Sequence, residues 1–249
     1  MTGTHDVNLG RGVNRLLRPL GLQVNRTYSR TDHKQFLPFS ATIAAAREKG
    51  LSVGDYVDQR YNVAGATQET IDRIAQLSVF SEQVKTAVEI GPGSGRYLEK
   101  VLRLCSPERY EIYETASPWA EYLTSTYNVV RQPTDGWSLR STENSSADLV
   151  QAYKVFVVTT FLSTCHYWQE MLRVARHGAY IIFDVMTEEC LDPQTLDQWL
   201  EPKRDYGIYP TILPRNYTIE FFTSRQASLI GSFQIPMRPG RTETFVFRS

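Results

Sequence analysis

The chain has 249 residues, of which 41% are hydrophobic and 22% are charged, so a buried core is expected and wholesale disorder is not. Its 27 Lys and Arg residues balance its 27 Asp and Glu residues, and a formal net charge of +0 gives no long-range attraction to nucleic acid or to an anionic membrane. The sequence shows no secretory signal, no bilayer-spanning run, and no zinc or disulfide spacing among its cysteines, so we expect a cytoplasmic protein without a nucleic-acid or membrane partner.

Residues 1–67 are predicted to form a helical N-terminal extension. It contains an amphipathic stretch at 14–24, "NRLLRPLGLQV", which is suited either to covering a ligand or to forming a homodimer. A helix is predicted over 40–49, with Ser40 as its N-cap and Gly50 as its stop. The aromatic and polar segments "HKQFLPF" and "GDYVDQRYN" suit a cover over an acceptor, because tyrosine combines an apolar ring with a hydroxyl.

A second domain is predicted over 68–249, introduced by a helix at 67–80. Short apolar runs there alternate with amphipathic segments, which is typical of βαβ units in a parallel sheet. The predicted strands are 86–90, 110–114, 128–132, 147–152 and 179–185, and the helices between them are 95–104, 118–127 and 164–176. A helix at 217–226 and strands at 228–235 and 242–248 around "MRPGR" predict an antiparallel C-terminal hairpin. The whole pattern predicts an α/β fold with a doubly wound, mostly parallel, seven-stranded sheet.

The loop after the first strand, "AVEIGPGSGRYLEKVL", sets glycines at positions 91, 93 and 95, where a charged ligand can approach the backbone. A triphosphate loop requires Gly-Lys-Ser/Thr at the start of the helix, and Arg96 and Tyr97 stand there instead. A dinucleotide fingerprint that starts at Gly91 would require glycine in place of Arg96, so this alternative is weakened by one mismatch and stays open.

The pattern that remains, an acid followed by three alternate glycines, resembles the first motif of class I S-adenosylmethionine methyltransferases. The resemblance implies a Rossmann-like fold and S-adenosylmethionine as the cofactor. It also implies that Glu89 helps to hold the methionine end and that the glycines let the backbone pass close to the cofactor. The implied cofactor-binding residues are Glu89, Gly91, Gly93, Gly95, Glu114, Asp135, Gly136, Trp137 and Ala152.

Three of these positions follow later strands. Glu114 ends the strand at 110–114, where a carboxylate accepts both ribose hydroxyls in related nucleotide folds. Asp135, in "PTDGWSL", is the residue that the resemblance assigns to the adenine amine, with Gly136 and Trp137 beside the ring. An ordinary Asp-Gly turn explains the same residues equally well. Ala152 ends the strand at 147–152, where cofactor and acceptor are expected to meet.

A closer resemblance concerns the acceptor. The segments "NRLLRPLGLQVNR", "YEIYETASPWAEYL", "QPTDGWSL" and "FDVMTEEC" look like those of small bacterial methyltransferases of saccharides, such as methylmannose polysaccharide methyltransferases. This implies methyl transfer to a hydroxyl of a sugar or polysaccharide precursor, with a mannoside or another oligosaccharide as acceptor. The alternatives are a small-molecule acceptor such as a lipid or an aromatic metabolite, or a silent protein that binds the cofactor without turnover.

Transfer to an alkyl hydroxyl requires removal of a proton, and the candidate bases follow the fourth and fifth strands. Asp184 is the first choice because it ends a strand that aims at the cleft, and His166 is the second because of its intrinsic pKa. Tyr153, Lys154 and Glu188 complete the set, although His166 suits a helix-packing role equally well. Acids after the fifth strand are also compatible with Mg²⁺, which no spacing demands.

Overall fold

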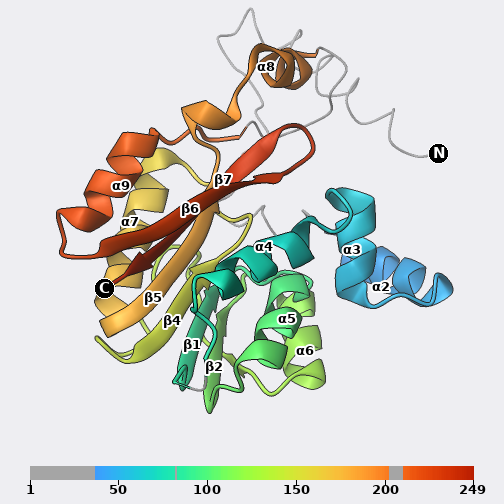
Figure 1. Ribbon diagram of the computed structural model, residues 1–249. Helices are drawn as coiled ribbons and strands as arrows, with labels where there is room; N and C mark the ends of the chain where they lie inside the picture. Colours follow the sequence, from blue (N-terminus) through green and yellow to red (C-terminus); the bar gives the residue numbers. More distant parts are fainter. Residues whose placement is uncertain (1–36, 82, 202–209) are drawn as a thin grey trace, which may run out of the picture. The chain divides into compact units, whose positions relative to one another are not determined.

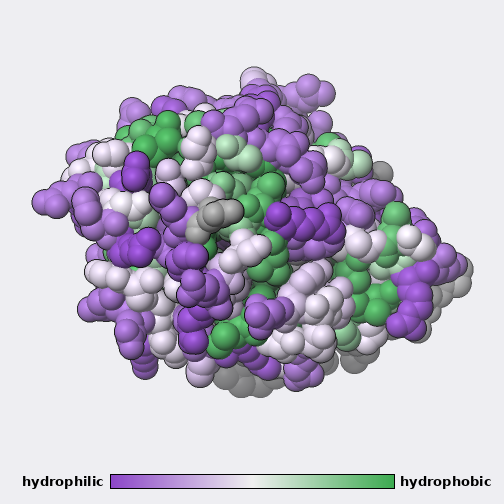
Figure 2. Space-filling view, turned by 60° about the horizontal axis from the view of Figure 1, so that its bottom comes forward, coloured by the Kyte–Doolittle hydropathy of each residue, from purple (hydrophilic) through white to green (hydrophobic). Residues whose placement is uncertain are grey.

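The computed structural model describes residues 37–81, 83–201 and 210–249, which all belong to one compact unit. The predicted amphipathic stretch at 14–24 lies outside the described residues. No helix in the described ranges is both long and apolar enough to cross a membrane. The face drawn in Figure 2 carries mostly hydrophilic residues, with hydrophobic residues gathered in a few patches, as is usual for a protein surface.

From residue 37 onward, three helices precede the sheet: α2 (Phe39–Glu48), α3 (Val53–Tyr61) and α4 (Ala66–Gln76). The helix predicted over 40–49 is present, but Ser40 is not its N-cap. The cap position is Pro38, which makes no side-chain cap bond, and the helix already includes Phe39. Phe39 packs edge-on against Trp119, with the ring centroids 5.0 Å apart, so tertiary packing rather than capping chemistry sets this helix start.

Helix α3 was not among the predicted elements. Ser52 caps it by accepting a hydrogen bond from the backbone N–H of Asp55. Its buried residues include Gly54 and Asp58, neither of which gives an apolar helical pattern. The amphipathic signal was therefore hidden by a glycine and a carboxylate on the buried face.

The sheet has seven strands in the order β3-β2-β1-β4-β5-β7-β6, which confirms the predicted fold class. The parallel strands are β1 (Thr86–Ile90), β2 (Arg109–Tyr113), β3 (Val130–Arg131), β4 (Ala147–Ala152) and β5 (Ala175–Val185). The hairpin strands β6 (Ser228–Pro236) and β7 (Arg241–Arg248) are antiparallel, and β7 pairs with β5. The largest differences from the predicted bounds are in β3, which is shorter, and in β5, which begins four residues early, directly after the preceding helix; β2, β6 and β7 differ by one residue.

The connecting helices are α5 (Arg96–Leu104), α6 (Ser117–Thr126), α7 (Phe161–Val174), α8 (Pro193–Leu200) and α9 (Arg215–Thr223), with a 3₁₀ turn η3 (Glu188–Cys190). Helix α8 was not predicted, although its start carries a clear signal. Asp192 is its N-cap and accepts from the N–H of Thr195, and Pro193 occupies the first turn.

The two faces of the sheet are covered by different helices (Figure 1). Helices α7 and α9 pack on one face, where Trp168 and Phe222 lie among the rings of Phe183, Phe245 and Phe247. Helices α4 and α5 pack on the other face through apolar residues such as Ile74 and Leu98. Because every residue of β4 is buried, the centre of the sheet is fixed from both sides, and the loops at its edge start from a rigid base.

Candidate functional site

The carboxyl ends of the parallel strands bring the predicted site loops to one edge of the sheet. The glycine loop that follows β1 is tied to β2, because the backbone N–H of Gly91 donates to the carbonyl of Tyr113 over 2.9 Å. Gly91, Gly93 and Gly95 have φ values of +61°, +54° and +78°, a region that strongly favours glycine. The loop therefore has a backbone path that other residues would adopt only with strain.

The three glycines differ in what surrounds them. A Cβ atom at Gly91 would lie 2.7 Å from Cγ2 of Val155, and one at Gly95 would lie 2.5 Å from Cδ2 of Leu123. A Cβ atom at Gly93 would meet no atom within 4 Å. Side-chain packing inside the protein therefore excludes a Cβ atom at Gly91 and Gly95. At Gly93 the backbone borders a space that no described residue fills, and we call this space the open cradle.

Glu114 joins this cradle to the loop after β2. Its side chain is buried, with Oε2 accepting from the backbone N–H of Gly93 and Oε1 from that of Ala116, both over 2.8 Å. Burial raises the pKa of Glu114, and the hydrogen bonds from Ala116 and Gly93 oppose part of this rise. A carboxylate with about four lone-pair positions keeps capacity for further donors after these two bonds.

Glu89 lies in the sheet directly before the glycine loop and is 1% exposed. Its Oε2 accepts from the hydroxyl of Tyr110 and, over 3.0 Å, from Nε2 of Gln151. Burial raises the pKa of Glu89 to about 7, against the opposing effect of these two hydrogen bonds, and the nearby charge of Glu114 adds to the rise. None of the described Lys, Arg or His side chains pairs with it.

The turn after β3 lies next to the Glu114 loop, since a Cβ atom at Gly136 would be 3.4 Å from Cγ2 of Thr115. Asp135 accepts from the backbone N–H groups of Trp137 and Ser138 and from the Ser138 hydroxyl. Burial alone would raise the pKa of Asp135, but these hydrogen bonds outweigh it and the pKa is lowered. These are the contacts of a turn-stabilising carboxylate, and the adenine contact implied by the resemblance stays a prediction.

His166 belongs to the same region of the edge. Its ring stacks on that of Trp137, with centroids 4.3 Å apart and planes inclined by 16°. Its Nε2 is buried and has no hydrogen-bond partner among the described residues. His166 therefore contacts the turn after β3, and its expected role toward the acceptor stays a prediction.

The residues at the end of β4 are buried. Ala152 is paired with Ile90 and Phe183 in the sheet. Tyr153 stacks on Tyr97 with ring centroids 4.1 Å apart, and its hydroxyl donates to Gln151. Burial above all, and then the nearby Glu89, raises the pKa of Tyr153 well above its usual value. Such a phenol is a core residue and a poor proton acceptor, in contrast to the catalytic role expected from its position.

Asp184, at the end of β5, is held in a buried ion pair. Its Oδ1 accepts from the backbone N–H of Lys154 and its Oδ2 from Nζ of the same residue, each over 2.6 Å. Lys154 Nζ also donates to the hydroxyl of Thr242 over 2.6 Å. Lys154 has a φ of +59°, in the left-handed region, and in this conformation both its backbone N–H and its ammonium donate to the Asp184 carboxylate. Asp184 therefore pairs with a cation at the strand end where a base facing the cleft was expected.

Glu188 has a structural contact, because its Oε2 accepts from the backbone N–H of Arg215 at the start of α9. Arg215 also pairs with the buried Glu243 over 2.8 Å. Within the described ranges, no three His, Cys, Asp or Glu side chains gather so that they could hold a metal ion. The Mg²⁺ considered from the sequence finds no support among these residues.

Two groups near the edge were missed by sequence reasoning. Asp58 of α3 is buried, accepts from Thr67 and Asn62, and lies 3.4 Å from Arg96, the first residue after the glycine loop. Gln151 interrupts the otherwise apolar end of β4, which is the signal that could have found it. Asp58 carried no such signal, because the helix that contains it, α3, was not predicted.

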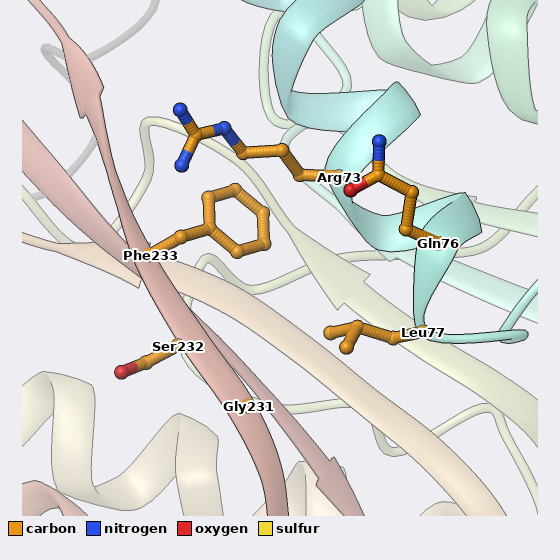
Figure 3. A pocket seen from close by; sticks show the side chains of 6 residues that line it. All are labelled: Arg73, Gln76, Leu77, Gly231, Ser232 and Phe233. Atoms are coloured by element: carbon orange, nitrogen blue, oxygen red, sulfur yellow. The ribbon is translucent and has the colours of Figure 1, made fainter.

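A separate hollow of about 190 Å³ lies between α4 and β6 (Figure 3). In it, the side chain of Arg73 extends over the ring of Phe233, with a distance of 5.5 Å between the guanidinium carbon and the ring centroid. This hollow is smaller than the usual 300–1,000 Å³ of ligand pockets, and none of the predicted site residues lines it. Its lining residues are Arg73, Gln76, Leu77, Gly231, Ser232 and Phe233.

Solved methyltransferases share this fold. N-methyltransferase NodS from Bradyrhizobium japonicum WM9, in complex with S-adenosyl-L-homocysteine, has a TM-score of 0.56 at 16% identity, covering 85% of this chain and 97% of its own. An O-methyltransferase family protein from Burkholderia thailandensis has a TM-score of 0.57 at 15% identity, covering 97% and 83%. A SAM-dependent methyltransferase from Aquifex aeolicus has a TM-score of 0.51 at 11% identity, covering 86% and 100%. No protein-family model and no curated protein sequence matches the chain.

Proposed function

We propose that the chain binds S-adenosylmethionine at this edge and transfers a methyl group to a hydroxyl of a saccharide or polysaccharide precursor. The observation that carries the proposal is the open side of Gly93 next to the buried carboxylate of Glu114. A ligand that approaches the backbone at Gly93 also comes within reach of a carboxylate that accepts hydroxyl donors. This pairing fits a nucleoside with a ribose and a charged extension.

The remaining residues of the edge fit the other parts of that cofactor. Glu89 is a buried carboxyl group that pairs with no Lys, Arg or His side chain in the described part of the chain, and an ammonium group such as that of the methionine end would complement it. Trp137 presents an aromatic ring beside Gly136, close to the Glu114 loop, as an adenine site requires. When bound, S-adenosylmethionine supplies an electrophilic methyl group on a sulfonium.

The chain must then orient the acceptor hydroxyl and deal with its proton. Lys154 stands between the glycine loop and β5, since its neighbour Val155 abuts Gly91. Its ammonium uses two donors on Asp184 and Thr242, and a third donor remains for an acceptor oxygen. We therefore infer that Asp184 is a positioning residue that holds Lys154, with Lys154 as the group that orients the acceptor. His166 stays the second candidate for the proton.

The saccharide class rests on the resemblance of the sequence and on the hydrogen-bonding groups at this edge. The remaining donor of Lys154, whose ammonium is held by the buried Asp184 and Thr242, suits an oxygen of a polyhydroxylated acceptor. An apolar acceptor is the alternative, because the ring of Phe161 meets that of Tyr217 at 5.4 Å and the neighbouring Leu162 is 74% exposed at the start of α7.

The test is incubation with methyl-labelled S-adenosylmethionine and a panel of mannose-containing oligosaccharides, lipids and phenols. Label in a saccharide is expected, and label only in a lipid or a phenol would overturn the acceptor class but leave the cofactor assignment. Cofactor binding with no transfer to any acceptor would indicate a silent binding protein. As a matched pair, Lys154→Met should lower kcat by at least about 10²-fold with unchanged cofactor affinity, and Lys154→Arg should retain more of it.

A further inference from the structure

Glu89 is a buried titratable group whose surroundings are neutral or of like charge. From β2 it faces Tyr110, and from β4 it faces Gln151 and, beyond it, Tyr153. The charged group that acts on it is Glu114, which is also an acid. A buried carboxylate with neutral donors and no counter-cation is costly, and such a group lowers that cost by keeping its proton.

The hydrogen-bond pattern leaves one side of this carboxyl group unused. Both donors, the Tyr110 hydroxyl and Gln151 Nε2, meet the same oxygen, Oε2, and Gln151 Nε2 also donates to the Tyr110 hydroxyl over 2.6 Å. No described donor bonds to Oε1. Glu89 stands in β1 two residues before Gly91, so the residue lies at the base of the glycine loop.

We propose that cofactor binding at the glycine loop is coupled to the release of a proton from Glu89. This rests on the proposed function. In the protein alone Glu89 is about half in its neutral acid form at pH 7 and largely neutral at pH 6. When a ligand ammonium approaches, the carboxylic O–H bond breaks and the proton passes to the buffer. The ligand supplies a cation that none of the described residues provides, and the resulting carboxylate keeps its hydrogen bonds from Tyr110 and Gln151.

The consequence is a pH-dependent affinity with a definite direction. Below about pH 7 the ligand must displace a bound proton, so the affinity should fall by up to tenfold per pH unit as the pH is lowered. Above about pH 8 the carboxylate is already formed and the affinity should level off. If the bound pKa falls to about 5, release amounts to about 0.8 proton per site at pH 6, about 0.5 at pH 7 and about 0.1 at pH 8.

The test is isothermal titration calorimetry of the full chain with S-adenosyl-L-homocysteine, at pH 6, 7 and 8, in pairs of buffers that differ in ionisation enthalpy. The slope of the binding enthalpy against the buffer enthalpy gives the number of protons released. Glu89→Gln, which is nearly isosteric and keeps an acceptor for Tyr110, should abolish the release and flatten the pH profile, and it corrects for any titration of the ligand itself. Tyr110→Phe removes a donor that stabilises the carboxylate, so it should move the midpoint to higher pH.

The matched control is Glu114→Gln, which should bind more weakly at every pH while still releasing the proton. Binding by the unaltered chain without proton release would overturn the inference and leave the proposed function standing. Release that persists in Glu89→Gln but is lost in Glu114→Gln would assign the proton to the wrong carboxyl group and overturn it as well. Absence of binding at any pH would overturn both proposals.

Discussion

The buried acids at the carboxyl edge of the sheet have different partners in the two halves of that edge. At the ends of β1 and β2, Glu89 and Glu114 accept hydrogen bonds from a phenol, an amide and backbone N–H groups. At the end of β5, Asp184 is paired with the ammonium of Lys154. Asp184 is neutralised by a cation of the chain, whereas Glu89 accepts only from neutral donors among the described residues, so a cationic ligand would act more strongly on Glu89 than on Asp184.

Because Asp184 forms a buried ion pair with Lys154, we expect substitution of Asp184 to cause the largest loss of folding stability. Asp184→Asn leaves the Lys154 ammonium in a buried site without its counter-charge, and we expect a loss of about 3–5 kcal/mol in the free energy of unfolding. Urea denaturation measures this loss. The double variant Lys154→Met with Asp184→Asn should recover most of it, and a loss below about 1 kcal/mol in the single variant would show that the pair is not structural.

Two glycines of the loop differ in their surroundings: Gly95 packs closely against Leu123, whereas Gly93 borders an open space. Gly95→Ala should lower the free energy of unfolding by about 2–5 kcal/mol, because it adds left-handed strain and a clash with Leu123. Gly93→Ala carries the strain alone, about 1–2 kcal/mol. Thermal or urea unfolding of the two variants checks the difference, and equal losses would contradict the open cradle at Gly93.

Glu89 should make stability depend on pH in the opposite sense to a salt-bridged acid. Its pKa is about 7 in the folded chain, against an ordinary value of 4.5, so the folded state holds the proton more tightly. The contribution of Glu89 to stability is therefore complete below about pH 4.5 and is lost as the pH rises to about 7, by at most about 3 kcal/mol. Urea denaturation between pH 5 and 8 should show this fall in the unaltered chain relative to Glu89→Gln. Parallel profiles for the two proteins would rule it out.

Much of the fold could be predicted because its signals are local. The strands at 86–90 and 147–152 have the predicted bounds, since uninterrupted apolar runs mark buried parallel strands. The three glycines likewise stand where the backbone has positive φ. Helix α3 was missed because its buried face carries Gly54 and Asp58, which give no apolar period.

The site was harder to predict because side-chain pairing is not local. Asp184 was expected to be a base. Its ion-pair partner Lys154 lies 30 residues away, and no sequence pattern near Asp184 predicts that pairing. Tyr153 was expected to act at the active edge, but its side chain is buried and stacks on Tyr97 of α5. Whether a polar residue at a strand end meets solvent, a ligand or a partner depends on the elements packed around it.

The most direct test of the central claim is calorimetric titration of S-adenosylmethionine into the unaltered chain and into Glu114→Ala. Removal of the carboxylate should weaken binding by about 1–3 kcal/mol, the usual value of hydrogen bonds to a charged group, while circular dichroism shows an unchanged fold. No binding to the unaltered chain, or an equal affinity in the folded Glu114→Ala variant, would contradict the assignment of the glycine-loop edge as the cofactor site.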